Sequence, residues 1–103
     1  MNYTVQSLSN SPKVPFNIDG RILFSNSKNE IIRLNLKPGE ILDVHSNPLD
    51  VVFYVLKGKG VLEIENDIIV ACEDMTIFVK AGVMRSWKNS FNDILTILVF
   101  KII

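Results

Sequence analysis

The chain has 103 residues, 48% of them hydrophobic, and its eleven basic side chains balance eleven acidic ones. This length suits one domain, and the apolar content is enough for a core, which excludes an intrinsically disordered chain. The zero net charge lacks the basic surplus that nucleic acid or an anionic membrane surface attracts. We therefore expect neither as a partner.

A single cysteine and a single histidine limit the sites that one chain can build. Cys72 has no second cysteine for an internal disulfide, and His45 has no second histidine for a two-histidine metal site. The first residues lack the basic and apolar regions of a signal peptide. No apolar run approaches the roughly 20 residues that span a bilayer. We expect a soluble cytoplasmic protein.

The first 20 residues differ in composition from the rest of the chain. They are rich in serine and proline and have few consecutive apolar positions. We predict an N-terminal arm over 1–20, ordered where it docks, and one domain over 21–103. Within the arm, Tyr3, Val5 and Leu8 form an apolar strip suited to contact with the second copy of a homodimer, which we expect.

From residue 21 onward, short β-prone runs alternate with turns. Residues 30–36, for example, alternate between apolar and polar side chains, which is the period of a half-buried strand. The predicted strands cover 21–25, 30–36, 41–45, 51–56, 61–65, 68–71, 75–80, 84–88 and 94–103. Nine short strands at regular spacing, with no sustained helical period, predict an all-β sandwich or barrel.

The centre of the chain contains glycines and polar residues at a distinctive spacing. The pattern G(X)5HXH(X)3-4E(X)6G matches Gly39, His45 and Gly58. At its second histidine and its glutamate, this chain has Asn47 and Val51. In this spacing the segment resembles the first motif of the cupin superfamily.

A second pattern follows, and it resembles the second cupin motif. The pattern G(X)5PXG(X)2H(X)3N matches Gly82 and Asn89, while Asp74, Lys80 and Arg85 stand at its first glycine, its proline and its histidine. Together the two motifs span about half of the chain. The resemblance implies a single-domain, cupin-type jelly-roll β-barrel.

The resemblance also implies where a metal would be bound. Metal-binding cupins hold a divalent ion with two histidines and a glutamate of the first motif and a histidine of the second. Those positions hold His45, Asn47, Val51 and Arg85 in this chain. Only His45 is a good ligand, because Val51 has no donor atom and the permanent charge of Arg85 repels a cation. We expect no cofactor; a divalent metal with His45 as a ligand is the alternative.

The substituted positions suggest a different kind of pocket. Alternation along barrel strands would turn one set of side chains inward. We predict a ligand-binding site, with no catalytic residue, formed by His45, Asn47, Val51, Phe53, Arg85 and Trp87. A buried guanidinium needs an acidic partner or an anionic ligand, so the site suits a small polar or anionic molecule. The alternatives are that Arg85 pairs with Asp43, Glu63 or Glu73 at the barrel rim, or that it is solvated.

Two classes of function remain open. The first, which we favour, is a metal-free module that binds an unidentified small molecule. The second is an enzyme of isomerase, lyase or dioxygenase type, either metal-dependent or using His45 as a base. Acid–base catalysis usually needs a second titratable group with a separated pKa. The nearest candidate, Tyr54, is offset by one residue from the inward positions of its strand.

Overall fold

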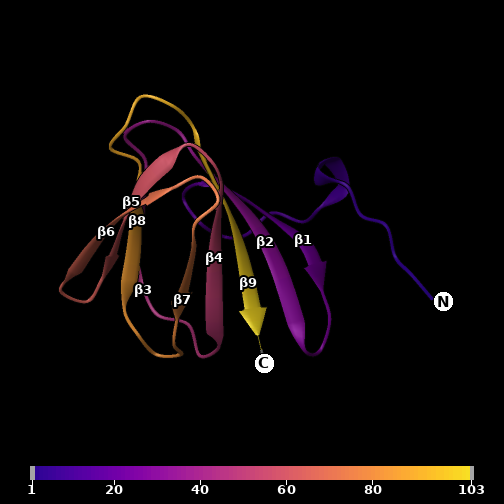
Figure 1. Ribbon diagram of the computed structural model, residues 1–103. Helices are drawn as coiled ribbons and strands as arrows, with labels where there is room; N and C mark the ends of the chain where they lie inside the picture. The colour runs from indigo at the N-terminus through magenta and orange to yellow at the C-terminus, as the bar shows by residue number, and fades with distance from the viewer. Residues whose placement is uncertain (1, 103) are drawn as a thin grey trace.

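The computed structural model describes residues 2–102, which form nine β-strands and one short 3-10 helix (Figure 1). The nine predicted strands are all present, and within residues 2–102 their ends are shifted by at most two residues; Ile103, the predicted end of the last strand, lies outside the described residues. Within residues 2–102, no helix is long and apolar enough to cross a membrane. The elements are η1 Leu8–Asn10, β1 Asp19–Ser25, β2 Asn29–Leu36, β3 Ile41–His45, β4 Asp50–Lys57, β5 Lys59–Ile64, β6 Asp67–Cys72, β7 Thr76–Val79, β8 Arg85–Lys88 and β9 Leu95–Ile102.

The strands form two sheets in which every pairing is antiparallel. One sheet has five strands in the order β1-β2-β9-β4-β7, and the other has four in the order β3-β8-β5-β6. The all-β jelly-roll prediction is confirmed. Among the described residues, however, hydrogen bonds do not join the sheets into one closed barrel.

The core lies between the two sheets and consists of alternate residues along the strands. In β2, for example, Ile32, Leu34 and Leu36 are buried, whereas Arg33 and Asn35 are only half-buried. Burial of each such side chain contributes about 1.5–3 kcal/mol to folding. The fully buried apolar residues are Leu36, Val51, Val55, Leu62, Ala71, Trp87, Leu95 and Ile97.

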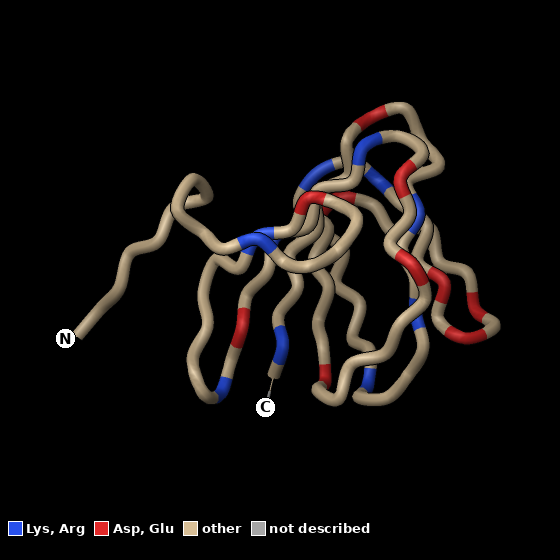
Figure 2. Tube along the Cα trace, turned by 180° about the vertical axis from the view of Figure 1, so that it is seen from behind, with Lys and Arg blue, Asp and Glu red and all other residues tan. Residues whose placement is uncertain are grey.

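The predicted arm consists of two parts that differ in burial. Residues 2–7 extend away from the body, as Figures 1 and 2 show from opposite sides, and they are exposed. Residues 11–18, which we call the strap, fold back against β1. Val14 and Ile18 of the strap are 9% and 6% exposed, and both belong to the core.

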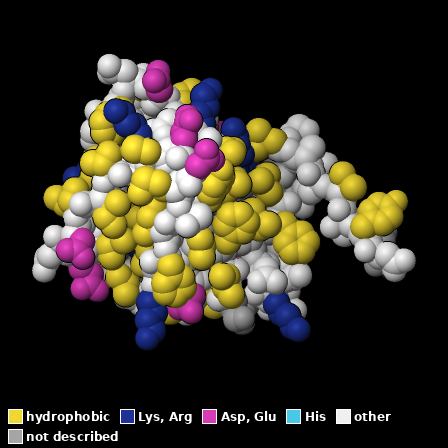
Figure 3. Space-filling view, in the orientation of Figure 1, with side chains coloured by type: hydrophobic (Ala, Val, Ile, Leu, Met, Phe, Trp, Pro, Cys, Tyr) yellow, Lys and Arg dark blue, Asp and Glu magenta, His cyan; other side chains and the backbone are white. Residues whose placement is uncertain are grey.

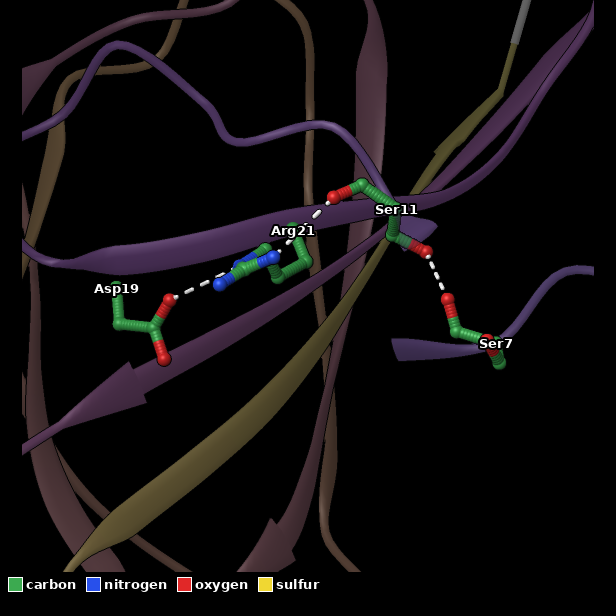
Figure 4. A network of polar contacts seen from close by, with 4 residues as sticks. All are labelled: Ser7, Ser11, Asp19 and Arg21. Atoms are coloured by element: carbon green, nitrogen blue, oxygen red, sulfur yellow. Dashed lines mark hydrogen bonds and ion pairs between the residues drawn. The ribbon is translucent and has the colours of Figure 1, made fainter. Parts of the chain in front are cut away.

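Polar contacts fix the beginning of the strap (Figure 4). The Ser11 hydroxyl donates to the backbone carbonyl of Ser7 at 2.6 Å. Arg21 of β1 donates through Nη1 to the Ser11 carbonyl at 3.3 Å and through Nε to Asp19 at 3.4 Å. The strap is therefore held to the edge strand of the five-stranded sheet, in a position that lets it reach the space between the sheets.

Candidate functional site

A cavity of about 260 Å³ lies between the two sheets, next to the strap. Its volume is just below the range of about 300–1,000 Å³ that drug-sized ligands occupy, so it suits a smaller molecule. Both sheets contribute to it: β2, β4 and β9 from one, β3 and β8 from the other. The lining residues are Phe16, Ile32, Leu34, Leu42, His45, Ser46, Asn47, Phe53, Arg85, Val99 and Lys101.

Four of the six predicted site residues meet in this cavity, namely His45, Asn47, Phe53 and Arg85. The other two lie in the core beside it. Val51 and Trp87 are both fully buried and do not border the cavity. The Trp87 ring packs edge-on against Phe53, with centroids 5.4 Å apart. Trp87 therefore supports a wall of the cavity from behind.

Arg85 is buried at the cavity with few partners. Its side chain is 2% exposed. Nη1 donates to the Val83 carbonyl at 3.0 Å, while the buried Nε has no hydrogen-bond partner. The guanidinium lies over the Phe53 ring, 5.9 Å from its centroid. Because a guanidinium carries five N–H donors, most of its hydrogen-bonding capacity is unused.

The rim carboxylates considered as partners of Arg85 are not paired with it. Within residues 2–102, no Asp or Glu oxygen lies within 4.0 Å of the Arg85 nitrogens. Glu63 instead pairs with Lys88 at 3.0 Å, and Glu73 accepts from the backbone N–H of Gly58 at 2.9 Å. Burial lowers the pKa of Arg85 from its ordinary value, but arginine stays charged at neutral pH.

The second basic group at the cavity has its own counter-ion. Lys101 pairs with Glu30, Nζ to Oε1, at 3.2 Å. No carboxylate side chain is among the residues that line the cavity. The uncompensated charge at this site is therefore the positive charge of Arg85.

A β-bulge in β3 turns His45 toward the cavity. Leu42 pairs with Trp87 and His45 pairs with Arg85, so three steps along β3 correspond to two along β8. The extra residue lets Leu42 and His45 face inward while Val44 is 60% exposed. Strict alternation from Leu42 would have placed Val44 inside and His45 outside. The bulge thus makes His45 a neighbour of Arg85.

The hydrogen bond of His45 determines which ring nitrogen remains available. Nδ1 lies 2.9 Å from the backbone carbonyl of Asp43, which can only accept. Nδ1 therefore carries the proton, and in the neutral ring Nε2 is an acceptor. The ring centroid is 5.9 Å from that of Phe16, at a tilt of 43°.

Asn47 combines a turn role with a position at the cavity. Its Oδ1 accepts from the backbone N–H of Leu49 at 3.0 Å. Its backbone carbonyl accepts from the N–H of Gly82 at 2.8 Å, which links the loops of the two sequence motifs. The side-chain oxygen is therefore engaged, and the amide nitrogen remains free to donate a hydrogen bond to a ligand.

Sequence reasoning missed seven of the lining residues. Alternation could have found Ile32, Leu34 and Val99, because they share the inward face of their strands. Phe16 had no such signal, since it lies on the strap outside any strand. The seven residues are Phe16, Ile32, Leu34, Leu42, Ser46, Val99 and Lys101.

A match to a family model identifies the family of this chain. A family model described as a cupin domain matches residues 32–101, which include every strand from β3 to β8 and most of β2 and β9. The chain belongs to the cupin family. No protein with a curated description matches this cupin in sequence.

Solved structures share the fold over nearly the whole chain. A predicted oxalate decarboxylase from Thermotoga maritima matches with a TM-score of 0.84 and 20% identity, over 97% of this chain and 99% of that one. An RmlC-like cupin family protein from Methanocaldococcus jannaschii matches with 0.82 and 22%, over 99% and 92%. KdgF from Halomonas sp. matches with 0.80 and 16%, over 97% and 95%. At such identities the likeness shows the fold alone.

The residues of this cupin do not fit the metal that its family implies. Among residues 2–102, no group of three or more His, Cys, Asp or Glu side chains could hold a metal ion. Val51 offers no donor, Arg85 is a cation, and the Asn47 Oδ1 is engaged by Leu49. His45 is left as a single ligand, which is too few for a family-style site. The absence of a metal stays a prediction.

Tyr54, considered as a partner for His45, lies outside the cavity. Its hydroxyl donates to Oδ1 of Asp74. That hydrogen bond is the main cause that raises the pKa of Tyr54, with smaller contributions from desolvation and from the charges of Asp74 and Glu73. The titratable side chains that line the cavity are therefore His45, Arg85 and Lys101.

We expect Asp74→Asn to lower the pKa of Tyr54, because the carboxylate that causes the shift is removed. Asn tolerates the positive φ of 66° at this position. Since the folded pKa is raised, the contact stabilises the fold fully below pH of about 10, and this contribution is lost as the pH rises through the folded pKa. Absorbance at 295 nm in a Tyr3→Phe background reports Tyr54 alone. Superimposable titration curves for the two proteins would contradict the assignment.

Proposed function

We propose that this cupin binds a small organic anion in the cavity between its sheets, without a metal ion. The observation that carries the proposal is the state of Arg85. Arg85 as a residue is 2% exposed, and its guanidinium has no carboxylate partner among residues 2–102 and borders the cavity. Such a charge is costly unless it is paired. A ligand carboxylate would accept two parallel N–H bonds from it.

One neighbouring group would complete the recognition of the carboxylate. The Asn47 amide nitrogen can donate a hydrogen bond to it. His45 lies beside Arg85 across the strands, but its Nε2 is an acceptor and a carboxylate has no proton to donate to it. The site would thus hold the charged end of the ligand with one cation and one amide donor. This agrees with a binding module, in which a fixed donor set orients a ligand in a mostly apolar pocket.

The direct test compares an anion with its uncharged isostere. Isothermal titration of the protein in EDTA with isobutyrate is expected to show binding, whereas isobutyramide is expected to show none. Replacing EDTA by Mn²⁺ is expected to leave the isobutyrate affinity unchanged. Binding that appears only with Mn²⁺ would indicate a metal site instead. Equal affinity for the amide would exclude a role for charge.

A matched pair of variants assigns the charge to Arg85. Arg85→Met is expected to abolish isobutyrate binding, because it removes the only uncompensated cation at the cavity. Arg33→Met removes the same charge from the half-buried outward face of β2 and is expected to bind normally. Loss of binding in both variants, or in neither, would contradict the proposal.

A further inference from the structure

We infer that the anion is a short aliphatic monocarboxylate; this inference rests on the proposed function and specifies its ligand. The two sides of the cavity differ in chemistry. The four-stranded sheet and its loop contribute Arg85, His45 and the adjoining polar residues, while the five-stranded sheet contributes mainly hydrocarbon. A ligand that matches both sides has one charged end and one apolar end.

The apolar side is formed by residues from several parts of the chain. Six of the eleven lining residues are hydrocarbon or aromatic: Phe16, Ile32, Leu34, Leu42, Phe53 and Val99. Ile32, Leu34 and Val99 lie on β2 and β9 of the five-stranded sheet, opposite the polar groups of β3 and β8, whereas Phe16 and Phe53 lie beside His45 and Arg85. Each ligand methylene placed against them leaves water for an apolar environment, which is favourable.

A second charge or several hydroxyls on the ligand would find few partners. Lys101 is the only other cation at the cavity, and Glu30 already neutralises it at 3.2 Å. The other donors at the cavity are the Asn47 amide nitrogen and the Ser46 hydroxyl, and the six apolar lining residues have none. The second carboxylate of a diacid, or the several hydroxyls of a sugar acid, would therefore mostly be buried against the apolar side without hydrogen bonds, at a free-energy cost.

The volume limits the length of the chain. A cavity of about 260 Å³ equals about nine volumes of roughly 30 Å³, the share of a water molecule. An acid of about four to six carbons, with six to eight non-hydrogen atoms, would fill it. Longer chains would have to leave through the opening or displace Phe16.

Titration with a homologous series tests this inference in EDTA. From acetate to pentanoate, each methylene is expected to raise affinity about fourfold, with a decline beyond about six carbons. Succinate is expected to bind at least tenfold more weakly than butyrate, which has the same carbon number. If succinate binds as tightly as butyrate, or affinity is independent of length while carboxylates still bind, the ligand class is wrong. If no carboxylate binds, the proposed function itself is wrong.

An isosteric pair of variants locates the apolar side. Val99→Thr is expected to reduce the affinity for pentanoate severalfold while leaving that for acetate nearly unchanged, because it makes the apolar wall polar. Val55→Thr introduces the same change at a fully buried position that does not line the cavity, and should leave both affinities unchanged. Equal responses of the two variants would contradict the placement of the ligand tail.

A separate observation concerns the outer face of the five-stranded sheet, the face turned away from the other sheet. The register aligns Phe24 with Ile31, Ile31 with Phe100, Phe100 with Val52, and Val52 with Phe78. These five residues form an apolar row across all five strands. Figure 3 shows hydrophobic side chains gathered over this sheet. Phe78 is 59% exposed, and a groove of about 450 Å³ borders the other four.

We propose that the homodimer expected from the sequence forms through this row, which a second copy of the chain would cover. The row itself has no charged member, so it can face its own copy without opposing like charges. Four strand spacings of about 4.8 Å and a strand of about 27 Å give the sheet face roughly 500 Å², whereas a stable interface needs about 800 Å² per partner. Residues 2–7 are uncharged, with Tyr3 75% and Val5 86% exposed, and would supply the rest of the buried interface area.

Sedimentation equilibrium at about 100 µM tests the homodimer. The native chain is expected to be a dimer, and Val52→Glu and Phe78→Glu are expected to be folded monomers by circular dichroism. Ile68→Glu changes a side chain that is 71% exposed on the other sheet and should remain dimeric. The double variant Tyr3→Ser, Val5→Ser should dimerise at least tenfold more weakly. A monomeric native chain, an equal effect of Ile68→Glu, or an unaffected arm variant would each overturn the proposal.

Discussion

Arg85→Met is expected to unfold at a higher temperature than the native chain when no anion is present. The variant removes the charge of a residue that is 2% exposed and has no counter-ion among the described residues. A methionine of similar length would pack against Phe53 without this desolvation cost. After the loss of the hydrogen bond to Val83, we expect a net gain of about 1–3 kcal/mol, which raises Tm by at least about 4 °C.

The sign of this effect distinguishes a ligand site from a structural arginine. Differential scanning calorimetry with and without isobutyrate is the measurement. The anion should raise the Tm of the native chain by mass action and leave that of Arg85→Met unchanged. Arg33→Met should stay within about 0.5 kcal/mol of the native chain. A variant that is less stable than the native chain without ligand would mean that Arg85 stabilises the fold, and the argument from an unpaired charge would fail.

Gly58→Ala is expected to destabilise the protein by about 2–5 kcal/mol. Gly58 has a positive φ of 77°, and an added Cβ would lie 2.4 Å from the backbone oxygen of Ile94. The left-handed conformation costs alanine about 1–2 kcal/mol, and the overlap with a backbone atom that cannot easily move costs about 1–3 kcal/mol more. Urea denaturation followed by tryptophan fluorescence measures the difference, since Trp87 is the only tryptophan.

Gly39 provides the matched control for this prediction. It has a positive φ of 86°, but an added Cβ would meet no atom within 4 Å. Gly39→Ala should therefore cost only the conformational part, about 1–2 kcal/mol. Both glycines belong to the first cupin motif, yet only one of them is required for close packing. Equal losses of stability in the two variants would show that the contact with Ile94 has been overestimated.

The strand pattern was accessible from the sequence because it depends on local chemistry. Alternating apolar side chains and turns of Pro, Gly, Asn and Asp predicted nine strands, and motif spacing predicted the cupin fold; the structure and the family match confirm both. The same alternation correctly indicated that Val51, Phe53 and Val55 share a buried face. These features depend on neighbouring residues in the chain, so short windows of sequence contain them.

The sequence by itself thus determined the strands, the family and the substituted metal positions, because side-chain period and residue type are properties of the chain. Only the tertiary structure decided which of those positions share a cavity. The bulge opposite β8 turns His45 inward, and the strap places Phe16 beside it. Val51 and Trp87 lie in the core and do not line the cavity. It also left Arg85 without a carboxylate among the described residues. These outcomes depend on register and on contacts between distant segments, which local patterns do not specify.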